Sequence, residues 1–274
     1  MFNPIINRLI MKIFKISSIF IILIISLLGL NLNAQTKSPE PKCGFSLTKK
    51  IIHKHLIYPK EALEQKKSGK ITVYYDVDMD GNASNYRVEN AFDEQCAEEA
   101  IRLVKMIEWN PAYNNGKPVS FNDYYTVEFS AKNYQKAEAK NPRLMIPEQE
   151  YPAQKSNNIY DFKDLHNSPK PYFADPQVTL NGFLRANLVY PDQAKQFEIQ
   201  GTVTLNFVIE TDGRASNILV ENSVGGGCDN EAIRLLQEMV WTPAVKNDSL
   251  VRTRTTQDFT FQIGERNYHD GNNY

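Results

Sequence analysis

Residues 69–90 read GKITVYYDVDMDGNASNYRVEN, and residues 201–222 read GTVTLNFVIETDGRASNILVEN, the same pattern 132 positions later without a gap. In both stretches apolar and polar residues alternate up to an Asp-Gly pair, which predicts a strand with one face on a core. Asp80-Gly81 and Asp212-Gly213 provide the positive φ of a tight turn, after which a second strand returns. The stretch that decides the fold is therefore a β-hairpin, present twice.

The repeat extends beyond the hairpin on both sides at the same spacing. The period is longer than the roughly 20 to 50 residues of solenoid and propeller repeats, so each copy is expected to fold by itself rather than lean on its neighbour. The matching positions are Tyr58-Pro59 and Tyr190-Pro191, Cys96 and Cys228, Glu99-Ala100-Ile101-Arg102-Leu103 and Glu231-Ala232-Ile233-Arg234-Leu235, and Trp109-x-Pro111-Ala112 and Trp241-x-Pro243-Ala244.

Two helices are predicted before each hairpin. Ser46 is expected to cap the first helix of the first copy, and Asp175 the corresponding helix of the second. Each ends at Tyr-Pro, and Pro59 and Pro191 then open a short helix that ends near Gly69 or Gly201. The apolar stripes of the first helices are Leu47, Ile51, Ile52 and Leu56, and Leu180, Phe183, Leu184 and Leu188.

A helix and a final strand are predicted after each hairpin. The order α-α-β-β-α-β indicates an α+β fold, two copies of a small three-stranded antiparallel sheet covered by helices. The helix stripes are Cys96, Ala100, Leu103, Val104 and Ile107, and Cys228, Ala232, Leu235, Leu236 and Met239. The last strands alternate Tyr125, Val127 and Phe129, and Phe259, Phe261 and Ile263.

The segments outside the repeat set the boundaries and the compartment. Lys12 and Lys15 precede an uncharged run and a small residue, Ala34, the pattern of a secretory signal over residues 1–34. The alternative is an uncleaved inner-membrane anchor, because the uncharged span approaches the ~20 residues that cross a bilayer. The predicted divisions are the signal at 1–34, a first domain at 45–131, a Pro-rich linker at 132–174 and a second domain at 175–264.

Charge and cysteine content exclude several classes of function. Without residues 1–34 the chain has 28 basic and 32 acidic side chains, a net charge of −4, which argues against a nucleic-acid partner. The three cysteines, Cys43, Cys96 and Cys228, form no zinc-type cluster, so no metal or other cofactor is expected. Cys43 lies outside the repeat and is expected to be the reactive thiol.

Two repeated features have a functional and a structural interpretation. Cys96 and Cys228 begin helices, where a lowered thiol pKa would suit a thiol-dependent enzyme, yet burial on the helix stripe explains them without chemistry. Trp109 and Trp241 suit a partner surface or the core, and the core is favoured. No catalytic constellation is repeated, so the chain is not expected to be an enzyme.

As a set, the repeated residues resemble the C-terminal domain of the TonB family. The closer match is the second copy, from Tyr190 through the Asp212-Gly213 turn to Trp241-Thr242-Pro243-Ala244, including Gly225-Gly226-Gly227-Cys228. In the first copy Asn114-Asn115-Gly116-Lys117-Pro118-Val119 is similar to the family's loop before the last strand. The resemblance implies a domain that binds the short N-terminal segment of outer-membrane receptors, which adds as a strand beside the domain's last strand.

Strand addition needs an edge with unpaired N–H and C=O groups, which the last strand of each copy could present. The partner-binding positions expected at these edges are Thr256, Asp258, Thr260 and Gln262 in the second copy and Thr126 and Glu128 in the first. The partner implied is an outer-membrane receptor or another envelope protein, met in the periplasm.

The chain departs from the TonB pattern at its N-terminal side. The resemblance implies a membrane helix with a histidine for inner-membrane motor partners and a long spacer, whereas residues 1–52 contain no histidine and only Thr36–Lys42 precede the first copy. The sequence therefore favours a periplasmic binding protein, and an inner-membrane-anchored energy transducer of TonB type is the alternative.

Overall fold

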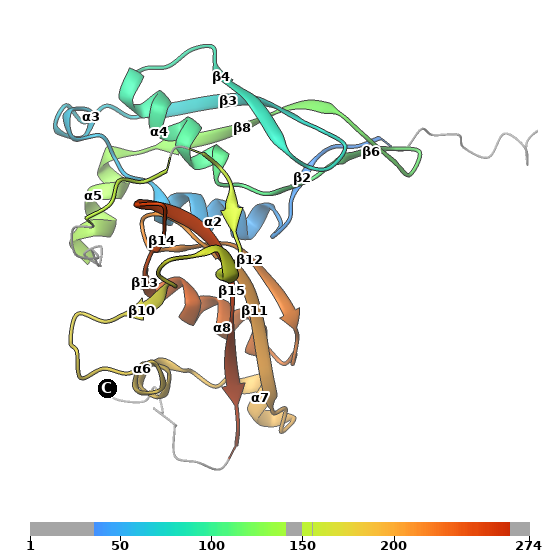
Figure 1. The fold of residues 1–274 in the computed structure, drawn as a ribbon, viewed down its shortest axis with the longest axis vertical. Helices are drawn as coiled ribbons and strands as arrows, with labels where there is room; N and C mark the ends of the chain where they lie inside the picture. Colours follow the sequence, from blue (N-terminus) through green and yellow to red (C-terminus); the bar gives the residue numbers. More distant parts are fainter. Residues whose placement is uncertain (1–35, 141–149, 155, 264–274) are drawn as a thin grey trace, which may run out of the picture.

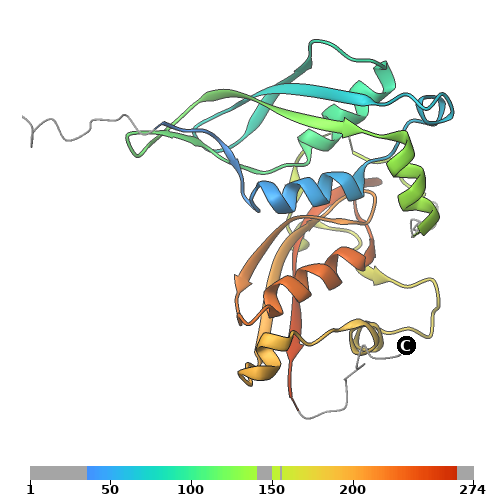
Figure 2. The same cartoon turned by 180° about the vertical axis from the view of Figure 1, so that it is seen from behind.

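A computed structural model describes residues 36–140, 150–154 and 156–263, so the predicted signal segment lies outside the described residues. In Figure 1 the first copy, in blue to green, forms the upper half, and the second copy, in orange and red, forms the lower half. Figure 2 shows the same arrangement from behind.

The first copy is a three-stranded antiparallel sheet with helices against one face. Its strands stand in the order β4-β3-β8, with the hairpin in the predicted place and the last strand at the edge. The α+β prediction is confirmed. The elements are α2 (Phe45–His55), α3 (Lys60–Glu64), β3 (Gly69–Val77), β4 (Ala83–Val88), α4 (Glu94–Lys105) and β8 (Phe121–Phe129).

The second copy repeats this order and extends the sheet. Its strands stand in the order β12-β11-β15-β14, because the last strand is longer and folds back on β14 (Ala244–Lys246). The repeated elements are α6 (Leu180–Asn187), α7 (Asp192–Gln196), β11 (Gly201–Ile209), β12 (Ala215–Asn222), α8 (Cys228–Glu238) and β15 (Ser249–Phe261).

Several short strands were not predicted. The Asn115-Gly116 pair turns β6 into β7, and Asn247 and Asp248 turn β14 into β15, all with positive φ, as two-residue hairpins require. Besides β14 and the strands of the segment between the copies, the unpredicted strands are β1 (Thr36–Lys37), β2 (Glu40–Pro41), β5 (Trp109–Asn110), β6 (Ala112–Asn114), β7 (Lys117–Val119) and β13 (Val240–Thr242).

The predicted helix caps are wrong by two residues in the first copy and by four in the second. Gly44, not Ser46, precedes α2 and offers no side-chain cap. In the second copy the cap is Thr179, whose hydroxyl accepts a hydrogen bond from the Gly182 N–H at 3.1 Å. Asp175 instead accepts from the Gln177 N–H in a turn, so the helix begins later than the Asp-Pro pair suggested.

Each copy has its own apolar core, in which the repeated aromatic and sulfur side chains are buried. Trp109 packs on Tyr75 with ring centroids 4.8 Å apart, and Trp241 packs on Phe207 at 5.5 Å. Cys96 and Cys228 are fully buried beneath α4 and α8. The fold thus supports the interpretation that the two cysteines and the two tryptophans are core residues.

The two copies nevertheless pack against each other, whereas the sequence led us to expect two independent domains. Helix α2 lies between the sheet of the first copy and the strands of the second (Figures 1 and 2). Ile52 belongs to the core of the first copy, whereas its neighbour Ile51 belongs to that of the second. The apolar residues of α2 therefore lie on two sides of the helix and join the two cores. The sequence analysis assigned them to a single face, so it did not predict this contact.

Buried polar contacts complete this interface. His55 Nδ1 lies 3.0 Å from Asp212 Oδ2, and its Nε2 lies 3.1 Å from the Ala215 carbonyl oxygen. Asn217 donates to the Met106 carbonyl at 2.8 Å and accepts from the Glu108 N–H at 2.9 Å. The tip of the second hairpin is therefore docked under the first copy.

In the segment between the copies, a helix packs on the first copy and the later residues run over the second copy. The segment carries α5 (Ala131–Lys140), β9 (Ile159–Tyr160), the short helix η1 (Phe162–Asp164) and β10 (Lys170–Tyr172), where the sequence predicted an aperiodic linker. β9 pairs in parallel with β15, and β10 pairs with β13. Residues 141–149 and 155 of this segment lie outside the described residues.

Candidate partner-binding edge

Strand β8 forms one edge of the first sheet. It pairs along its whole length with β3, from Phe121 opposite Val77 to Phe129 opposite Gly69. Among the described residues no strand pairs with its other side. Every second N–H and C=O group of an edge strand points away from its neighbour, so this side offers main-chain donors and acceptors to an added strand.

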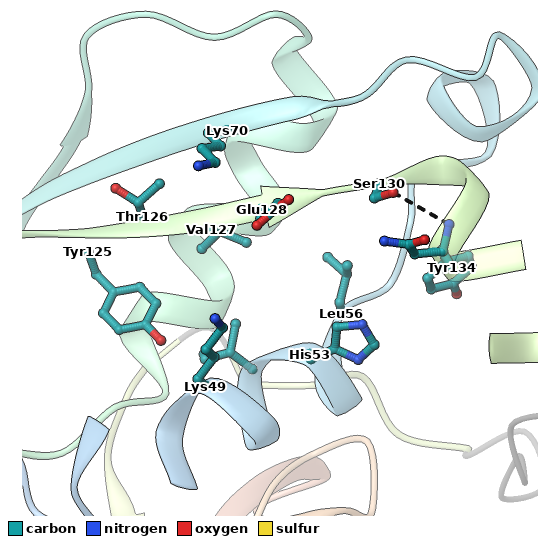
Figure 3. A pocket seen from close by; sticks show the side chains of 12 residues that line it. Lys49, His53, Leu56, Lys70, Tyr125, Thr126, Val127, Glu128, Ser130 and Tyr134 are labelled. Carbon is teal, nitrogen blue, oxygen red and sulfur yellow. Dashed lines mark hydrogen bonds between the residues drawn. The ribbon is translucent and has the colours of Figure 1, made fainter. Parts of the chain in front are cut away.

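A groove of about 420 Å³ runs beside this edge. Figure 3 shows β8 along one side of the groove and α2 along the other. α5 and the end of β8 close one end. The lining residues are Lys49, Ile52, His53 and Leu56 of α2, Lys70 of β3, Tyr125, Thr126, Val127 and Glu128 of β8, and Ser130, Asn133 and Tyr134.

The side chains of β8 alternate between the groove and the outer face. Tyr125 and Val127 point toward α2, and Val127 is buried, whereas Thr126 and Glu128 are exposed (Figure 3). The Thr126 hydroxyl lies 3.1 Å from that of Thr72, its partner on β3. An added strand would thus meet Tyr125 and the apolar Val127 on one face and the polar Thr126 and Glu128 on the other.

The charge of the groove is predominantly positive. Lys49 and Lys70 take part in no ion pair among the described residues, and His53 lies between Lys49 and Leu56 on the wall (Figure 3). The one carboxylate that lines the groove is Glu128, opposite Lys70 in the strand register. The lysines are therefore available to a partner's carboxylates.

Helix α2 is fixed as a wall by contacts from α4. Arg102 donates to the carbonyl oxygen of His55 at 2.8 Å, where α2 ends, and to Glu99 at 2.7 Å. Glu99 in turn accepts from the Ile57 N–H at 2.7 Å. Arg234 and Glu231 repeat this clamp on Asn187 and Val189 in the second copy, which gives the repeated Glu-x-x-Arg a structural role that the sequence did not disclose.

The corresponding edge of the second copy is β15. Phe259 and Phe261 are buried and Thr256, Asp258 and Thr260 are exposed, the alternation expected from the sequence, while Gln262 follows the end of the strand. Two of these exposed side chains already bond across to β11. Thr204 donates to Asp258 at 2.7 Å, and the hydroxyls of Thr202 and Thr260 lie 3.1 Å apart.

The start of this second edge is covered by the connecting segment. Ile159 and Tyr160 of β9 pair with Arg252 and Thr253 of β15, and η1 lies against the same strand. In the first copy the equivalent position is Phe121, beside which no strand is paired within the described residues. The two edges are thus similar in sequence but differ in what lies beside them.

The buried thiols are unsuited to nucleophilic catalysis. Burial, with the carboxylate of Asp93, raises the pKa of Cys96 to about 12, and burial raises that of Cys228. A thiol with a raised pKa contains little thiolate at neutral pH, and the thiolate is the nucleophile. Cys43 is half-buried, and its Sγ lies 3.2 Å from the Thr48 hydroxyl.

Comparison with known proteins supports the resemblance seen in the sequence. The family described as Gram-negative bacterial TonB protein C-terminal matches residues 54–131 and 186–263. The solution structure of the Pseudomonas aeruginosa TonB C-terminal domain is 28% identical and covers 39% of this chain and 97% of that one, with a TM-score of 0.28. No curated protein matches.

Among the described residues, no helix has the length and apolar character needed to cross a membrane. The two family matches together span more than half of the chain, and the α+β fold agrees with them. A family of this kind implies a protein of the cell envelope that acts through protein interaction. The chain belongs to the TonB C-terminal domain family and carries two copies of that domain.

Proposed function

We propose that this is an exported, non-enzymatic binding protein that takes up extended segments of envelope proteins, outer-membrane receptors among them, by strand addition. It acts in the periplasm after removal of residues 1–34 and supports receptor-mediated transport. The observation that carries this proposal is the groove beside the unpaired edge of β8. Main-chain hydrogen bonds to the edge give the affinity, and the side chains that line the groove give preference among segments.

The contacts proposed for the two edges follow the strand alternation. Thr126 and Glu128 in the first copy, and Thr256, Asp258, Thr260 and Gln262 in the second, lie on the outer side and flank an added strand. An inward-facing side chain of the segment would enter the groove of the first copy between Val127 and Leu56. Burying apolar surface there adds about 25 cal/mol per Å² to the main-chain bonds.

Photocrosslinking from the edge tests this proposal in the intact exported chain. A benzophenone amino acid in place of Thr126 should capture one contiguous segment of an envelope protein, because an added strand lies about 4.8 Å from β8. The matched position is Thr72 on β3, one strand further from the added segment. Equal capture from both positions would show binding to the sheet face rather than to the edge.

Proline variants supply the second half of the test. Thr126→Pro or Glu128→Pro should weaken capture sharply, since proline removes an N–H, whereas Thr126→Ala should change little. Asp258→Pro and Thr260→Pro make the same test on the second copy. Circular dichroism identifies variants that remain folded. Undiminished capture by folded proline variants of both edges would refute strand addition.

An inner-membrane-anchored energy transducer is the second candidate, and the uncharged span from Ile16 to Thr36 favours it. The mass of the protein purified from its native envelope separates the two. A chain that begins after Ala34 supports the periplasmic binding protein, and a chain that retains residues 1–34 supports the anchored transducer.

A further inference from the structure

The two copies differ in what lies beside the edge strand. In the second copy β9 occupies the edge of β15 at Arg252 and Thr253, and η1 lies against the same strand. The connecting segment is thus added to that edge in cis. Such a segment has a high effective concentration, because it belongs to the same chain, and competes with any partner there. The β8 edge has no such competitor among the described residues.

The connecting segment is also held to the second copy at further points. The Lys246 ammonium nitrogen lies 4.3 Å from the centroid of the Tyr160 ring. The Arg252 guanidinium donates to the Asn157 carbonyl at 3.0 Å. The Leu250 N–H donates to the Pro152 carbonyl at 2.9 Å. These contacts make β9 part of a longer strap rather than an isolated bridge.

The two copies also differ in charge at matching positions. Lys49, His53 and Lys70 line the groove of the first copy. The residues 132 positions later are Asn181, Arg185 and Thr202, so both lysines are absent from the second copy. On the outer side each edge has one carboxylate at these positions, because Thr126 and Glu128 are matched by Asp258 and Thr260. The first edge is thus more attractive to a carboxylate than the second.

The charges in the groove of the first copy are unevenly distributed along it. Lys49 lies opposite Tyr125, and Leu56 and Tyr134 lie toward the other end (Figure 3). A strand laid along β8 would therefore place an apolar side chain at the Leu56 end and a charged one at the Lys49 end, about two to three residues apart at ~3.4 Å per residue. A carboxylate is the group that Lys49 would pair with.

We propose, on the basis of the function proposed above, that the copies are unequal: the β8 groove is the edge that receives a partner, it selects extended segments with a carboxylate at the Lys49 end, and β9 shortens the free β15 edge by covering its start at Arg252 and Thr253. The first copy is the domain that binds the partner's segment. The second copy anchors the strap and supports α2, which is one wall of the groove.

Selection from a library of displayed random peptides, with the full exported chain as bait, tests the choice of segment. Asp and Glu should be enriched at one position of the retained peptides. In the Lys49→Glu, Lys70→Glu double variant this enrichment should disappear or change to Lys and Arg. The matched control is Asn181→Glu, Thr202→Glu in the second copy, which should leave the enrichment unchanged.

A retained acidic peptide then gives the affinity and the stoichiometry by titration calorimetry. One peptide should bind per chain, and the double variant should bind it roughly tenfold more weakly at low salt, since the attraction of the two lysines for the peptide's carboxylate is replaced by repulsion. High salt should narrow this difference. Ile159→Gly with Tyr160→Gly should release β9 and raise the stoichiometry toward two.

Each remaining outcome is decisive. If the retained peptides show no enrichment of Asp or Glu but no longer bind the Thr126→Pro variant, the proposed selection for a carboxylate is wrong and strand addition is still supported. The proposed inequality of the copies is wrong if two peptides bind per wild-type chain. It is also wrong if Asp258→Pro abolishes peptide binding and Thr126→Pro does not. Retained peptides that are insensitive to both folded proline variants would overturn the proposed function itself.

Discussion

At the scale of single residues, positions that the two copies share build the fold, and positions that differ build the interface and the groove. Tyr190 donates its hydroxyl proton to the Ile199 carbonyl at 2.6 Å, and Tyr58 makes the matching bond to Lys67. By contrast His55, which docks on the second copy, is replaced by Asn187 in the second copy. Positions at which the copies differ therefore carry the information about the interface and the groove.

The pair of His55 and Asp212 makes the interface sensitive to acid. Burial alone would raise the pKa of Asp212, but the charge and hydrogen bond of His55 hold it well below its usual range. A depressed carboxyl pKa contributes stability above the unfolded value near ~4 that is lost as the pH falls through the folded value. Unfolding measured from pH 6 to pH 2 should show this loss.

Asp212→Asn should lower the unfolding free energy near pH 6 and flatten its pH dependence. The expected cost is roughly 2 to 3 kcal/mol, at the low end for a broken buried ion pair, because the Asp212 side chain is 18% exposed. The control is Asp80→Asn at the matching, exposed turn of the first copy, which should cost little. Similar losses from both variants would place the effect in the turn and not in the ion pair.

The three thiols should react in a defined order. Cys96 and Cys228 are fully buried and should be labelled by a thiol reagent only after unfolding. Burial raises the pKa of Cys43, so this half-buried thiol should react slowly at neutral pH and faster as the pH rises above 8. Mass spectrometry of labelled peptides reads the order. Fast native labelling of Cys96 would contradict the burial described here.

At the scale of elements, the sequence predicted what local chemistry dictates. The Asp-Gly turns have Gly81 and Gly213 at φ 86° and 76°, and a Cβ on Gly81 would clash with the Trp109 carbonyl oxygen. Helix starts and short strands were missed, because they depend on contacts distant in sequence. α5 was missed because the prolines of the neighbouring segment dominated its composition, although Tyr134 packs on Tyr58.

The clamp from α4 should be a measurable part of the stability of the first copy. Glu99→Ala removes the acceptor of the Ile57 N–H and the partner of Arg102, which should lower the unfolding free energy by about 1 to 3 kcal/mol. The control is Glu98→Ala on the exposed side of the same helix. Urea denaturation measures both, and an equal loss in the two variants would mean that helix propensity, not the clamp, is responsible.

At the scale of the whole molecule, the edges could be predicted but the groove could not. Alternation placed Thr126, Asp258 and Thr260 on the open face, because a strand's faces follow from its period of two. The groove depends on α2, whose position is set by docking between two copies far apart in sequence. Likewise nothing in the Pro-rich composition of the connecting segment predicted that β9 would add to β15.

The shared helix offers a test of how the two copies depend on each other. Ile51 and Ile52 are neighbours on α2 and are 5% and 6% exposed, yet they belong to the cores of different copies. Either substitution by alanine should cost about 2 to 5 kcal/mol, because each leaves a cavity. Ile51→Ala should nevertheless destabilise the second copy, and Ile52→Ala the first.

Native-state hydrogen exchange locates these costs. Ile51→Ala should speed exchange in β11 and β12 although the substitution lies in the first copy, whereas Ile52→Ala should act mainly on β3 and β8. Since α2 is also a wall of the β8 groove, loosening its seat on the second copy should reduce the uptake of a segment there as well. If Ile51→Ala leaves exchange in the second copy unchanged, α2 is not a shared element, and the second copy would have no role in forming the binding edge.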